Sequence, residues 1–266
     1  MLKCQVINSQ IISLTERMLD ISTPLQGSDG EERQRDIAYE MLRADIVSCR
    51  LAPAKSVTES ELALRYGIGK AAIRAALVRL GERGWVRAQS RRGYVVRPMT
   101  LRDIGEILEL RRILEPAALR LAAGRVDANR LREIDAVCGA GYVPGDTASE
   151  TTFLQAHRQF HLSIVLASGN RRLADDFRHV WDEIERVIHH TGLLRTHAAA
   201  LRHDHAALVA GLASGRGDAA AALAEEEIES LHRMIVDTAL RTASILVPAS
   251  GNATEKRNQS RTGLSS

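Results

Sequence analysis

The chain has 266 residues, 45% of them hydrophobic, 26% charged and only 3% aromatic, which is typical of a soluble, helix-rich protein with a buried core. The net charge of +3 says little by itself, but three widely spaced cysteines exclude a disulfide framework and favour a reducing compartment. No apolar run approaches the length of a membrane span and no secretory signal is recognisable, so we expect a cytoplasmic protein.

Charge is distributed unevenly along the chain. Residues 31–98 carry 14 Lys and Arg against 8 Asp and Glu, whereas residues 99–245 carry 17 against 21. The N-terminal third is therefore basic and most of the remainder is acidic. This asymmetry predicts two domains, the first of which meets a polyanion.

The N-terminal third predicts three helices in succession. Residues 1–30 contain the linker-like stretch "STPLQGSDG" and are interpreted as a weakly ordered extension. Residues 31–50 repeat apolar side chains at helical spacing and predict the first helix. Thr58 is a good N-cap for a second helix that runs to about Tyr66. After the tight turn "GIGK", a third helix begins at about Lys70.

Two short runs with β-strand character follow these helices, "WVRAQ" and "YVVRP". The residues between them, "SRRG", supply the turn chemistry of a hairpin. Helix, helix, turn, helix and hairpin is the order of a winged helix-turn-helix, which we predict over residues 31–98.

Basic side chains lie where such a motif meets DNA. Lys70 and Arg74 are one helical turn apart near the start of the third helix, the end that enters the major groove in these motifs. The hairpin tip carries Arg91, Arg92 and Gly93, so two guanidinium groups can lie along the DNA backbone. Any one of these arginines is as readily a solvated surface residue. Their combination with the helix order favours DNA binding.

The stretch "TESELALRYGIGKAAIRAALVRLGERGWVRAQSRRGYVVRP" resembles the DNA-binding domain of the GntR family of bacterial repressors. The resemblance covers nearly all of residues 33–98. It implies DNA contacts by the following residues: Ser60, Lys70, Arg74, Arg91, Arg92 and Gly93.

The match departs from the family pattern at the start of the third helix. "GKAA" stands where the family has Ser-Arg-Thr-Pro, and Ala75 replaces the usual glutamate. Lys70 cannot make the planar two-pronged contact of arginine to guanine. We therefore expect a different operator preference and a lower intrinsic affinity than the family norm.

The remainder of the chain predicts an all-α antiparallel bundle of about six helices over residues 99–245. Thr100 caps a long helix over about 101–124, and Asp127 begins another that runs to about Cys138. Residues 246–266 are polar and are predicted to be disordered. Further helices are expected at about 149–168, 171–191, 196–213 and 217–242.

Polar residues occupy apolar positions on three of these helices. His157 and His161 lie on the inward stripe of one helix, His205 on that of another, and Glu227 on that of the last. A single inward histidine is usually a satisfied core residue. Three of them with one inward carboxylate would be costly to bury separately, and a shared divalent ion (Zn²⁺, Ni²⁺ or Mn²⁺) would satisfy all four.

The segments "TLRDIGEILELRRILEPAALRLAA", "FHLSIVLASGNRRL" and "DHAALVAGL" resemble the FCD effector domain of the FadR subfamily, over about 100–240. The resemblance implies a divalent metal that helps to hold a carboxylate ligand. His161 and His205 match the family's metal ligands, and His157 stands where an aspartate is usual. The fourth ligand is Glu227 if Gly215 is the turn glycine.

Two assignments in this domain stay open. Glu229 and His232 are alternatives to Glu227 as the fourth ligand. Arg111 aligns with an arginine that the family often turns toward its pocket, so it is a candidate effector-binding residue. The alternative is that Arg111 is an exposed partner of Glu115, one turn further along the helix.

The resemblance implies a homodimeric repressor, not an enzyme, that binds a palindromic DNA operator in the nucleoid and responds to a small carboxylate or sugar acid. Two alternatives are kept. The protein is a direct metal sensor, or it is a helical metalloenzyme fused to a DNA-binding domain, for which the sequence offers no convincing acid or base.

Overall fold

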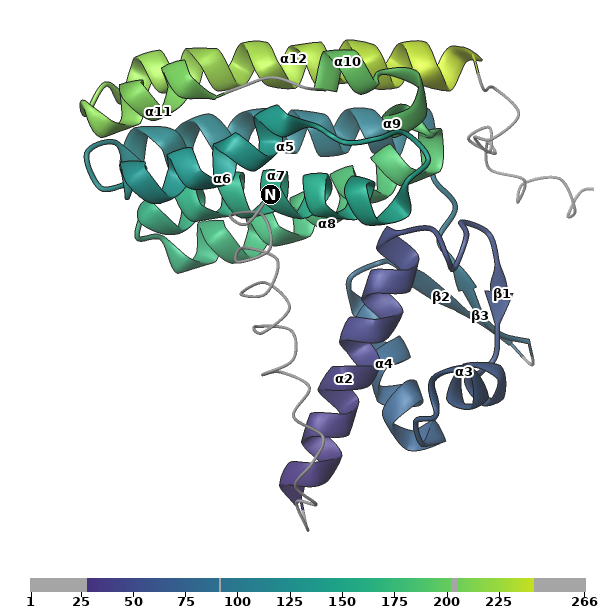
Figure 1. Cartoon of the computed structure of the whole chain (residues 1–266). Helices are drawn as coiled ribbons and strands as arrows, with labels where there is room; N and C mark the ends of the chain where they lie inside the picture. Colours follow the sequence, from purple (N-terminus) through teal and green to yellow (C-terminus); the bar gives the residue numbers. More distant parts are fainter. Residues whose placement is uncertain (1–27, 91, 202–204, 242–266) are drawn as a thin grey trace, which may run out of the picture. The chain divides into compact units, whose positions relative to one another are not determined.

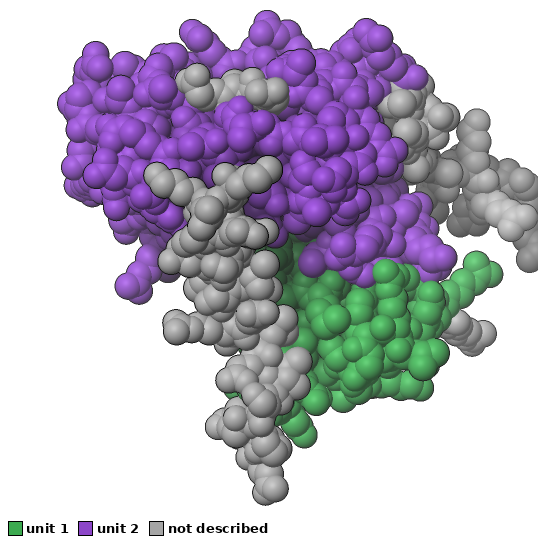
Figure 2. All heavy atoms as spheres, viewed as in Figure 1, with its two compact units in different colours: residues 1–43, 57–94 green, residues 44–56, 95–266 purple. Residues whose placement is uncertain are grey.

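The computed structural model divides the chain into two compact units, shown in different colours in Figure 2. Unit 1 comprises residues 1–43 and 57–94, and unit 2 comprises residues 44–56 and 95–266. The predicted extension, except for its last three residues, and the predicted C-terminal tail lie outside the part of the chain that the structure describes. The described residues are 28–90, 92–201 and 205–241.

The N-terminal elements are three helices and a small sheet, in the order predicted for a winged helix-turn-helix (Figure 1). The sheet has three strands in the order β1-β3-β2. The sequence predicted β2 and β3 but missed β1, because a two-residue strand is too short to show alternation. The elements are α2 (Ser28–Val47), β1 (Ser56–Val57), α3 (Glu59–Tyr66), α4 (Lys70–Glu82), β2 (Val86–Gln89) and β3 (Gly93–Val96).

Local signals explain the boundaries of α3. Thr58 has an extended backbone, and its hydroxyl accepts a hydrogen bond from the backbone N–H of Glu61 (3.1 Å). Gly67 ends the helix in the left-handed conformation (φ 65°). The apolar faces of the helices then meet in a small core, which includes Leu42, Leu62, Ile73, Leu77, Leu80 and Trp85.

Gly93 at the start of β3 is required by its surroundings. Its φ is +84°, and a Cβ placed there would lie 2.4 Å from the backbone oxygen of Val57. We expect Gly93→Ala to destabilise the protein by about 2 kcal/mol or more, because backbone strain and a backbone clash add together. Urea unfolding of the full chain measures this.

Gly67→Ala is the matched control for Gly93→Ala. Gly67 has a similar positive φ (+65°), but a Cβ placed at this position would have nothing within 4 Å of it. Its substitution isolates the conformational cost, about 1 kcal/mol. Equal losses for the two variants would contradict the close approach of Gly93 to Val57.

The described residues of unit 2 are mainly helical, and its long helices run alongside one another as a bundle (Figure 1). Thr100 and Asp103 cap α5 reciprocally, as a capping box. Asp127 and Asn170 cap α6 and α8. The long helices are α5 (Leu101–Ala122), α6 (Ala128–Ala140), α7 (Thr147–Ala167), α8 (Arg171–Thr191) and α12 (Gly217–Arg241).

The prediction of a single helix over 196–213 is wrong. The structure has α9 (Leu193–Thr196), α10 (Ala198–Leu201) and α11 (Ala206–Ala213) there. His205 is the N-cap of α11, and its backbone N–H donates to both oxygens of Asp135 (3.1 and 3.0 Å). A side chain on another helix has taken the N–H that a continuous helix would have used.

Among the described residues, none of the helices has the length and hydropathy of a membrane span.

The core of unit 2 has two main apolar clusters, and polar residues lie between them along three helices. On α7, Leu154 belongs to one cluster and Phe160 to the other. On α5 the corresponding residues are Leu108 and Leu119, and on α12 they are Leu231 and Ala224. The residues between these positions are His157 on α7, Arg111 and Glu115 on α5, and Glu227 on α12.

Candidate functional site

The predicted DNA-contacting side chains of unit 1 are exposed. Lys70 and Arg74 lie on the first two turns of α4, and Ser60 lies in the first turn of α3. Arg92 is exposed beside Gly93 at the hairpin. The prediction for Arg91 falls on a residue outside the described part of the chain.

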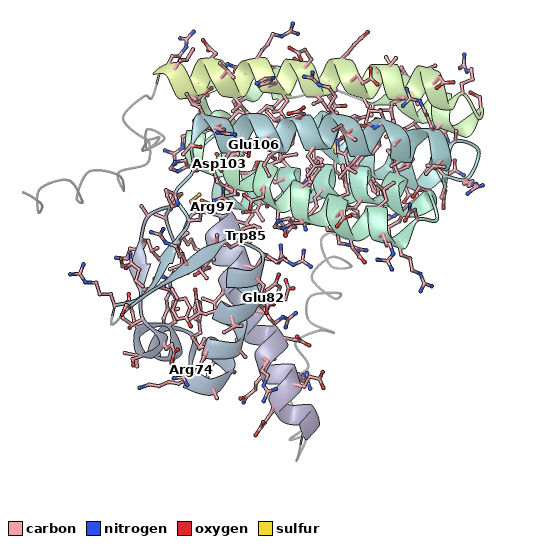
Figure 3. All side chains as sticks on the ribbon, turned by 180° about the vertical axis from the view of Figure 1, so that it is seen from behind. Arg74, Glu82, Trp85, Arg97, Asp103 and Glu106 are labelled. Atoms are coloured by element: carbon pink, nitrogen blue, oxygen red, sulfur yellow. The ribbon has the colours of Figure 1, made fainter. Side chains whose placement is uncertain are left out.

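Arg74 is held in a fixed orientation by a residue that the sequence reasoning missed. Its Nε and one Nη donate to the two carboxylate oxygens of Glu59, at 2.9 and 2.8 Å (Arg74 is labelled in Figure 3). The hydrogen bond from Arg74 holds the pKa of the Glu59 carboxyl below its usual value. Glu59 thus aims the guanidinium and also places a negative charge near any phosphate that approaches it.

Three candidate ligand atoms converge in unit 2, from α7, the start of α11 and α12. His161 Nε2 lies 3.5 Å from Glu227 Oε1, and His205 Nε2 lies 3.7 Å from Glu227 Oε2. The ligand atoms of these three residues all lie within 4.8 Å of one another. His161 and His205 are 1% and 3% exposed. Their arrangement is one that a divalent ion can occupy.

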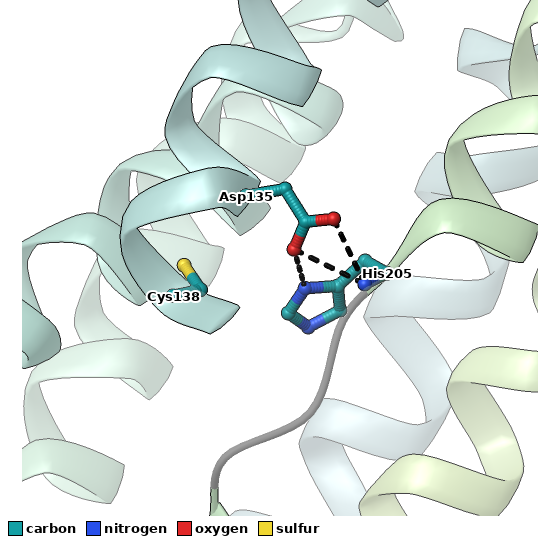
Figure 4. A group of neighbouring side chains, drawn as sticks. All are labelled: Asp135, Cys138 and His205. Atoms are coloured by element: carbon teal, nitrogen blue, oxygen red, sulfur yellow. Dashed lines mark hydrogen bonds and ion pairs between the residues drawn. The ribbon is translucent and has the colours of Figure 1, made fainter. Parts of the chain in front are cut away.

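Each of these histidines is fixed through its other ring nitrogen. Glu115 Oε1 lies 2.5 Å from His161 Nδ1, and Asp135 Oδ1 lies 2.7 Å from His205 Nδ1 (the second pair is drawn in Figure 4). A carboxylate at Nδ1 favours the proton there and leaves Nε2 as the lone-pair donor. The histidine rings are therefore presented toward Glu227 in the form that a metal requires.

Aromatic contacts restrain the same two rings. His205 is stacked on Phe160 with 4.2 Å between ring centroids, and His161 lies 4.6 Å from the Trp181 ring. Carboxylate and aromatic contacts together leave each ring little freedom to turn. Contacts within the protein therefore hold the two histidine rings in their positions.

The electrostatics of the cluster favour a cation. Arg111 pairs with Glu115 at 2.6 Å and approaches Glu227 at 3.7 Å. Burial opposes the charge of Glu115, but Arg111 and His161 outweigh it, so the pKa of Glu115 is lowered. Burial also opposes the charge of His205, but Glu227 and Asp135 outweigh it and raise its pKa.

The formal charges of the cluster also suit a divalent ion. Glu115, Asp135 and Glu227 each carry one negative charge and Arg111 carries one positive charge, so the cluster is −2 with neutral histidines and −1 with a proton on His205. A buried cluster with this excess is unfavourable without a counter-charge. A divalent cation would offset it, and the donor set fits such an ion.

Sequence reasoning missed Glu115 and Asp135, although a signal was present. Asp135 lies on the buried stripe of α6 with Leu131, Ile134 and Cys138. Glu115 lies on the buried stripe of α5, four residues after Arg111. An acid on an apolar stripe is the same signal that identified Glu227.

Cys138 lies beside Asp135 and His205 (Figure 4). Burial raises the pKa of the Cys138 thiol to about 12. The sulfur is therefore protonated at neutral pH and is a poor ligand. The Asp135 carboxylate already accepts three hydrogen bonds from His205. We therefore assign the Asp135 carboxylate the role of orienting His205.

His157 lies outside the group of three converging donors. Its ring is 4.3 Å from that of Phe153, 5.5 Å from that of His205 and 6.4 Å from that of His161. It is buried and lines the adjoining cavity. The structure thus brings together three of the four residues predicted as ligands.

The alternatives to Glu227 face elsewhere. Gly215 is the turn glycine before α12, with a φ of +74°. Glu229 forms an ion pair with Arg112 at 2.6 Å, with both side chains about half exposed. His232 is half-buried and does not join the converging donors.

A cavity of about 360 Å³ adjoins the three donors, and Arg111 lines it. The guanidinium of Arg111 lies 5.0 Å from the centre of the Trp181 ring. Arg111 is also the partner of Glu115, as in the alternative interpretation, but the pair is buried rather than exposed. Arg111 therefore both lines the cavity and pairs with Glu115.

Comparisons with known proteins match both parts of the chain. Residues 34–96 match the model for bacterial regulatory proteins of the gntR family, and residues 106–230 match the FCD domain. The uncharacterized HTH-type transcriptional regulator YdhC of Bacillus subtilis (strain 168) is 27% identical over 157 residues, 58% of this chain and 70% of that protein. The HTH-type transcriptional repressor RspR of Escherichia coli (strain K12) is 23% identical over 149 residues, 56% of this chain and 62% of that protein.

Two solved structures share the fold. A putative transcriptional regulator GntR from Rhodococcus sp. RHA1 has a TM-score of 0.63 and 24% identity, covering 77% of this chain and 98% of that one. E. coli McbR/YncC has a TM-score of 0.63 and 19% identity, covering 78% and 98%.

Proposed function

Because the chain belongs to the GntR family of bacterial regulatory proteins, with an FCD domain after its helix-turn-helix, it is a DNA-binding transcriptional regulator, and we propose that it is a repressor controlled by a small carboxylate. The effector binds in the cavity of unit 2, beside a divalent metal held by His161, His205 and Glu227. This binding changes the affinity of unit 1 for a DNA operator.

The convergence of the three donors beside a cavity that also contains Arg111 carries this proposal. A bound divalent ion would supply a Lewis-acidic position that accepts carboxylate oxygens. Glu115 and Asp135 hold the two histidine rings in place. Arg111 contributes positive charge at the cavity wall, and Trp181 shields it from water.

Direct metal sensing is the second candidate, because the same cluster would bind metal without any organic ligand. The family assignment leaves a helical metalloenzyme without support. The two remaining candidates differ in what metal alone does to DNA affinity.

The test uses full-length protein and an operator selected from a random duplex pool. The protein is stripped with a chelator and reloaded with Zn²⁺, and fluorescence anisotropy measures operator affinity with and without a panel of carboxylates. We expect zinc alone to change the affinity little, and zinc with one carboxylate to change it about 5- to 150-fold. A full change with zinc alone identifies a metal sensor, and no change in any arm rejects ligand control.

We further propose a homodimer on a palindromic operator. Leu110, Ile113 and Leu121 are 41%, 62% and 48% exposed, and they lie on one face of α5. Exposed apolar residues that share one helix face are suited to a partner surface. Light scattering on the full-length protein measures the number of chains.

Arg186 on α8 could transmit a structural change from the cavity to the segments where the chain passes from one unit to the other. Its Nη2 donates to the backbone oxygen of Arg97 (2.5 Å), and the backbone oxygen of Arg186 accepts a hydrogen bond from the Cys49 thiol (3.7 Å). Cys49 and Arg97 each lie within a few residues of a point where the chain passes from one unit to the other (Arg97 is labelled in Figure 3). Ile184 and Ile188, on either side of Arg186 in the same helix, line the cavity.

We expect Arg186→Met to uncouple the effector from the operator. The side chain would lose its bond to Arg97, so a shift of α8 would no longer reach the linker. The carboxylate that regulates the wild type should change operator affinity less than about threefold in this variant, against 5- to 150-fold in the wild type. Arg178→Met is the control, since Arg178 is on the same helix but pairs with Asp175 at the surface. A full response in Arg186→Met would contradict the route.

A further inference from the structure

The cavity in unit 2 has a polar end and an apolar end. At the polar end lie Arg111, His161, His205 and Glu227, within hydrogen-bonding or ion-pairing distance of one another or of Glu115. Three helices continue from there to the other end. Residues on α7 line the wall from His161 to Leu154. Residues on α8 line it from Trp181 to Ile188, and residues on α12 line it from Glu227 to Met234.

Each of these three helical paths is seven residues long, which is about 10 Å at 1.5 Å per residue. The three paths agree, so the polar and apolar ends are about 10 Å apart. The far end is lined by members of one buried apolar cluster and by Met234, which packs against it. These lining residues are Phe153, Leu154, Ile184, Ile188, Leu194, Leu201, Leu231 and Met234.

Four other polar residues line the cavity, and none of them belongs to that far-end cluster. His157 is buried on α7 between His161 and Leu154, and its ring packs against Phe153. Glu226 is exposed and Ser230 is half-buried, one turn apart on α12. Glu185 lies 3.3 Å from Arg158, with which it forms an ion pair. A ligand that carries hydroxyl groups on the part of its body beyond His157 and Ser230 would bury them against the apolar cluster without partners. Each such hydroxyl costs roughly tenfold in affinity or more.

We propose that the effector is a carboxylate with an aromatic or branched aliphatic body, rather than a sugar acid. Its carboxylate lies at Arg111 and the metal position, and its body extends along α7, α8 and α12 into the apolar end. A 150 Å³ cavity holds one benzene, so about 360 Å³ suits roughly ten to fourteen non-hydrogen atoms. This inference rests on the proposed function and narrows the ligand class of the same site.

The test is calorimetry on the full-length, zinc-loaded protein with three probes: 3-phenylpropionate, its neutral amide 3-phenylpropanamide, and gluconate. We expect 3-phenylpropionate to bind at least tenfold more tightly than either of the others. Because a ligand that binds the folded state raises the melting temperature, thermal unfolding provides a second readout.

Met234→Gln places an amide at the apolar end with little change in volume, and Leu240→Gln is its control. Leu240 lies on the same helix and is 65% exposed. We expect Met234→Gln to weaken 3-phenylpropionate at least tenfold and Leu240→Gln to leave it unchanged. Thermal unfolding of both variants without ligand verifies that they fold.

The outcomes separate this inference from the proposed function. Gluconate binding as tightly as 3-phenylpropionate, or more tightly, overturns the apolar body and leaves carboxylate control intact. Equal binding of the amide overturns the role of the carboxylate. Binding of none of the probes, with no change in melting temperature, overturns this inference, whereas the proposed function stands or falls with the separate operator assay.

Discussion

His205→Ala is expected to lower the Zn²⁺ affinity of the full-length protein by more than about 100-fold, because loss of a ligand should exceed the 10- to 100-fold typical of its supporting partners. His205 Nε2 is one of three converging donors, and its ring is fixed by Asp135 and by stacking on Phe160. Removing the ring leaves two donors, and Asp135 keeps only its hydrogen bonds from the backbone N–H of residue 205. Competition with a chromophoric chelator measures the affinity.

Substitution of Asp135, whose carboxylate supports His205, should give a smaller loss of zinc affinity than His205→Ala. Asp135→Asn keeps the shape of the side chain but weakens the hold on His205 Nδ1, so we expect a loss of about 10- to 100-fold. His157→Ala should cost less than about tenfold in zinc affinity, because its ring lies outside the three donors and packs against Phe153 in a tilted orientation. Comparable melting temperatures of the metal-free variants would show that the losses are not caused by unfolding.

His232→Ala is the control for this series. His232 lies on α12 near Glu227 in sequence but outside the converging donors. We expect no change in zinc affinity. An equal loss in His232→Ala and His205→Ala, or no loss in either, would contradict the assignment of the metal position.

The helices of unit 2 were predictable where a capping residue and an apolar stripe agreed. The helix expected over 171–191 is α8 with the same limits, since Asn170 caps its start and Gly192 ends it. The helix that was mispredicted, over 196–213, has no such agreement. Its apolar residues fit one stripe, but a hydrogen bond from the backbone N–H of His205 to Asp135, 70 residues earlier, decides where α11 begins.

The candidate site was predictable to the extent that each residue reports its own helix face. His161, His205 and Glu227 were found because each is a polar residue on an apolar stripe. Periodicity gives the direction of a side chain but not its distance from residues on other helices. It therefore grouped His157 with His161, whereas in the structure their ring centroids are 6.4 Å apart and the His157 ring packs against Phe153. It also gave no sign that Glu59 holds Arg74, because neither residue is buried and 15 residues separate them.

Arg74→Ala is expected to weaken binding to a selected operator about 10- to 100-fold, the range for one side chain that reads a base edge. Arg74 is on the second turn of α4, is exposed, and is oriented by Glu59 rather than left to sample rotamers. Fluorescence anisotropy on the full-length protein, over a range of salt concentrations, measures the loss. Arg132→Ala on α6 removes the same charge from unit 2 and is the control.

The salt series shows what Arg74 contacts. If it reads a base, the loss is large on the selected operator and small on random DNA. If it contacts only phosphate, both duplexes weaken alike, and the slope of log affinity against log salt falls by about one. We expect the first result, because the Glu59 carboxylate next to the guanidinium disfavours a phosphate there. Affinity unchanged at every salt concentration would remove Arg74, and with it the assigned face of α4, from the DNA interface.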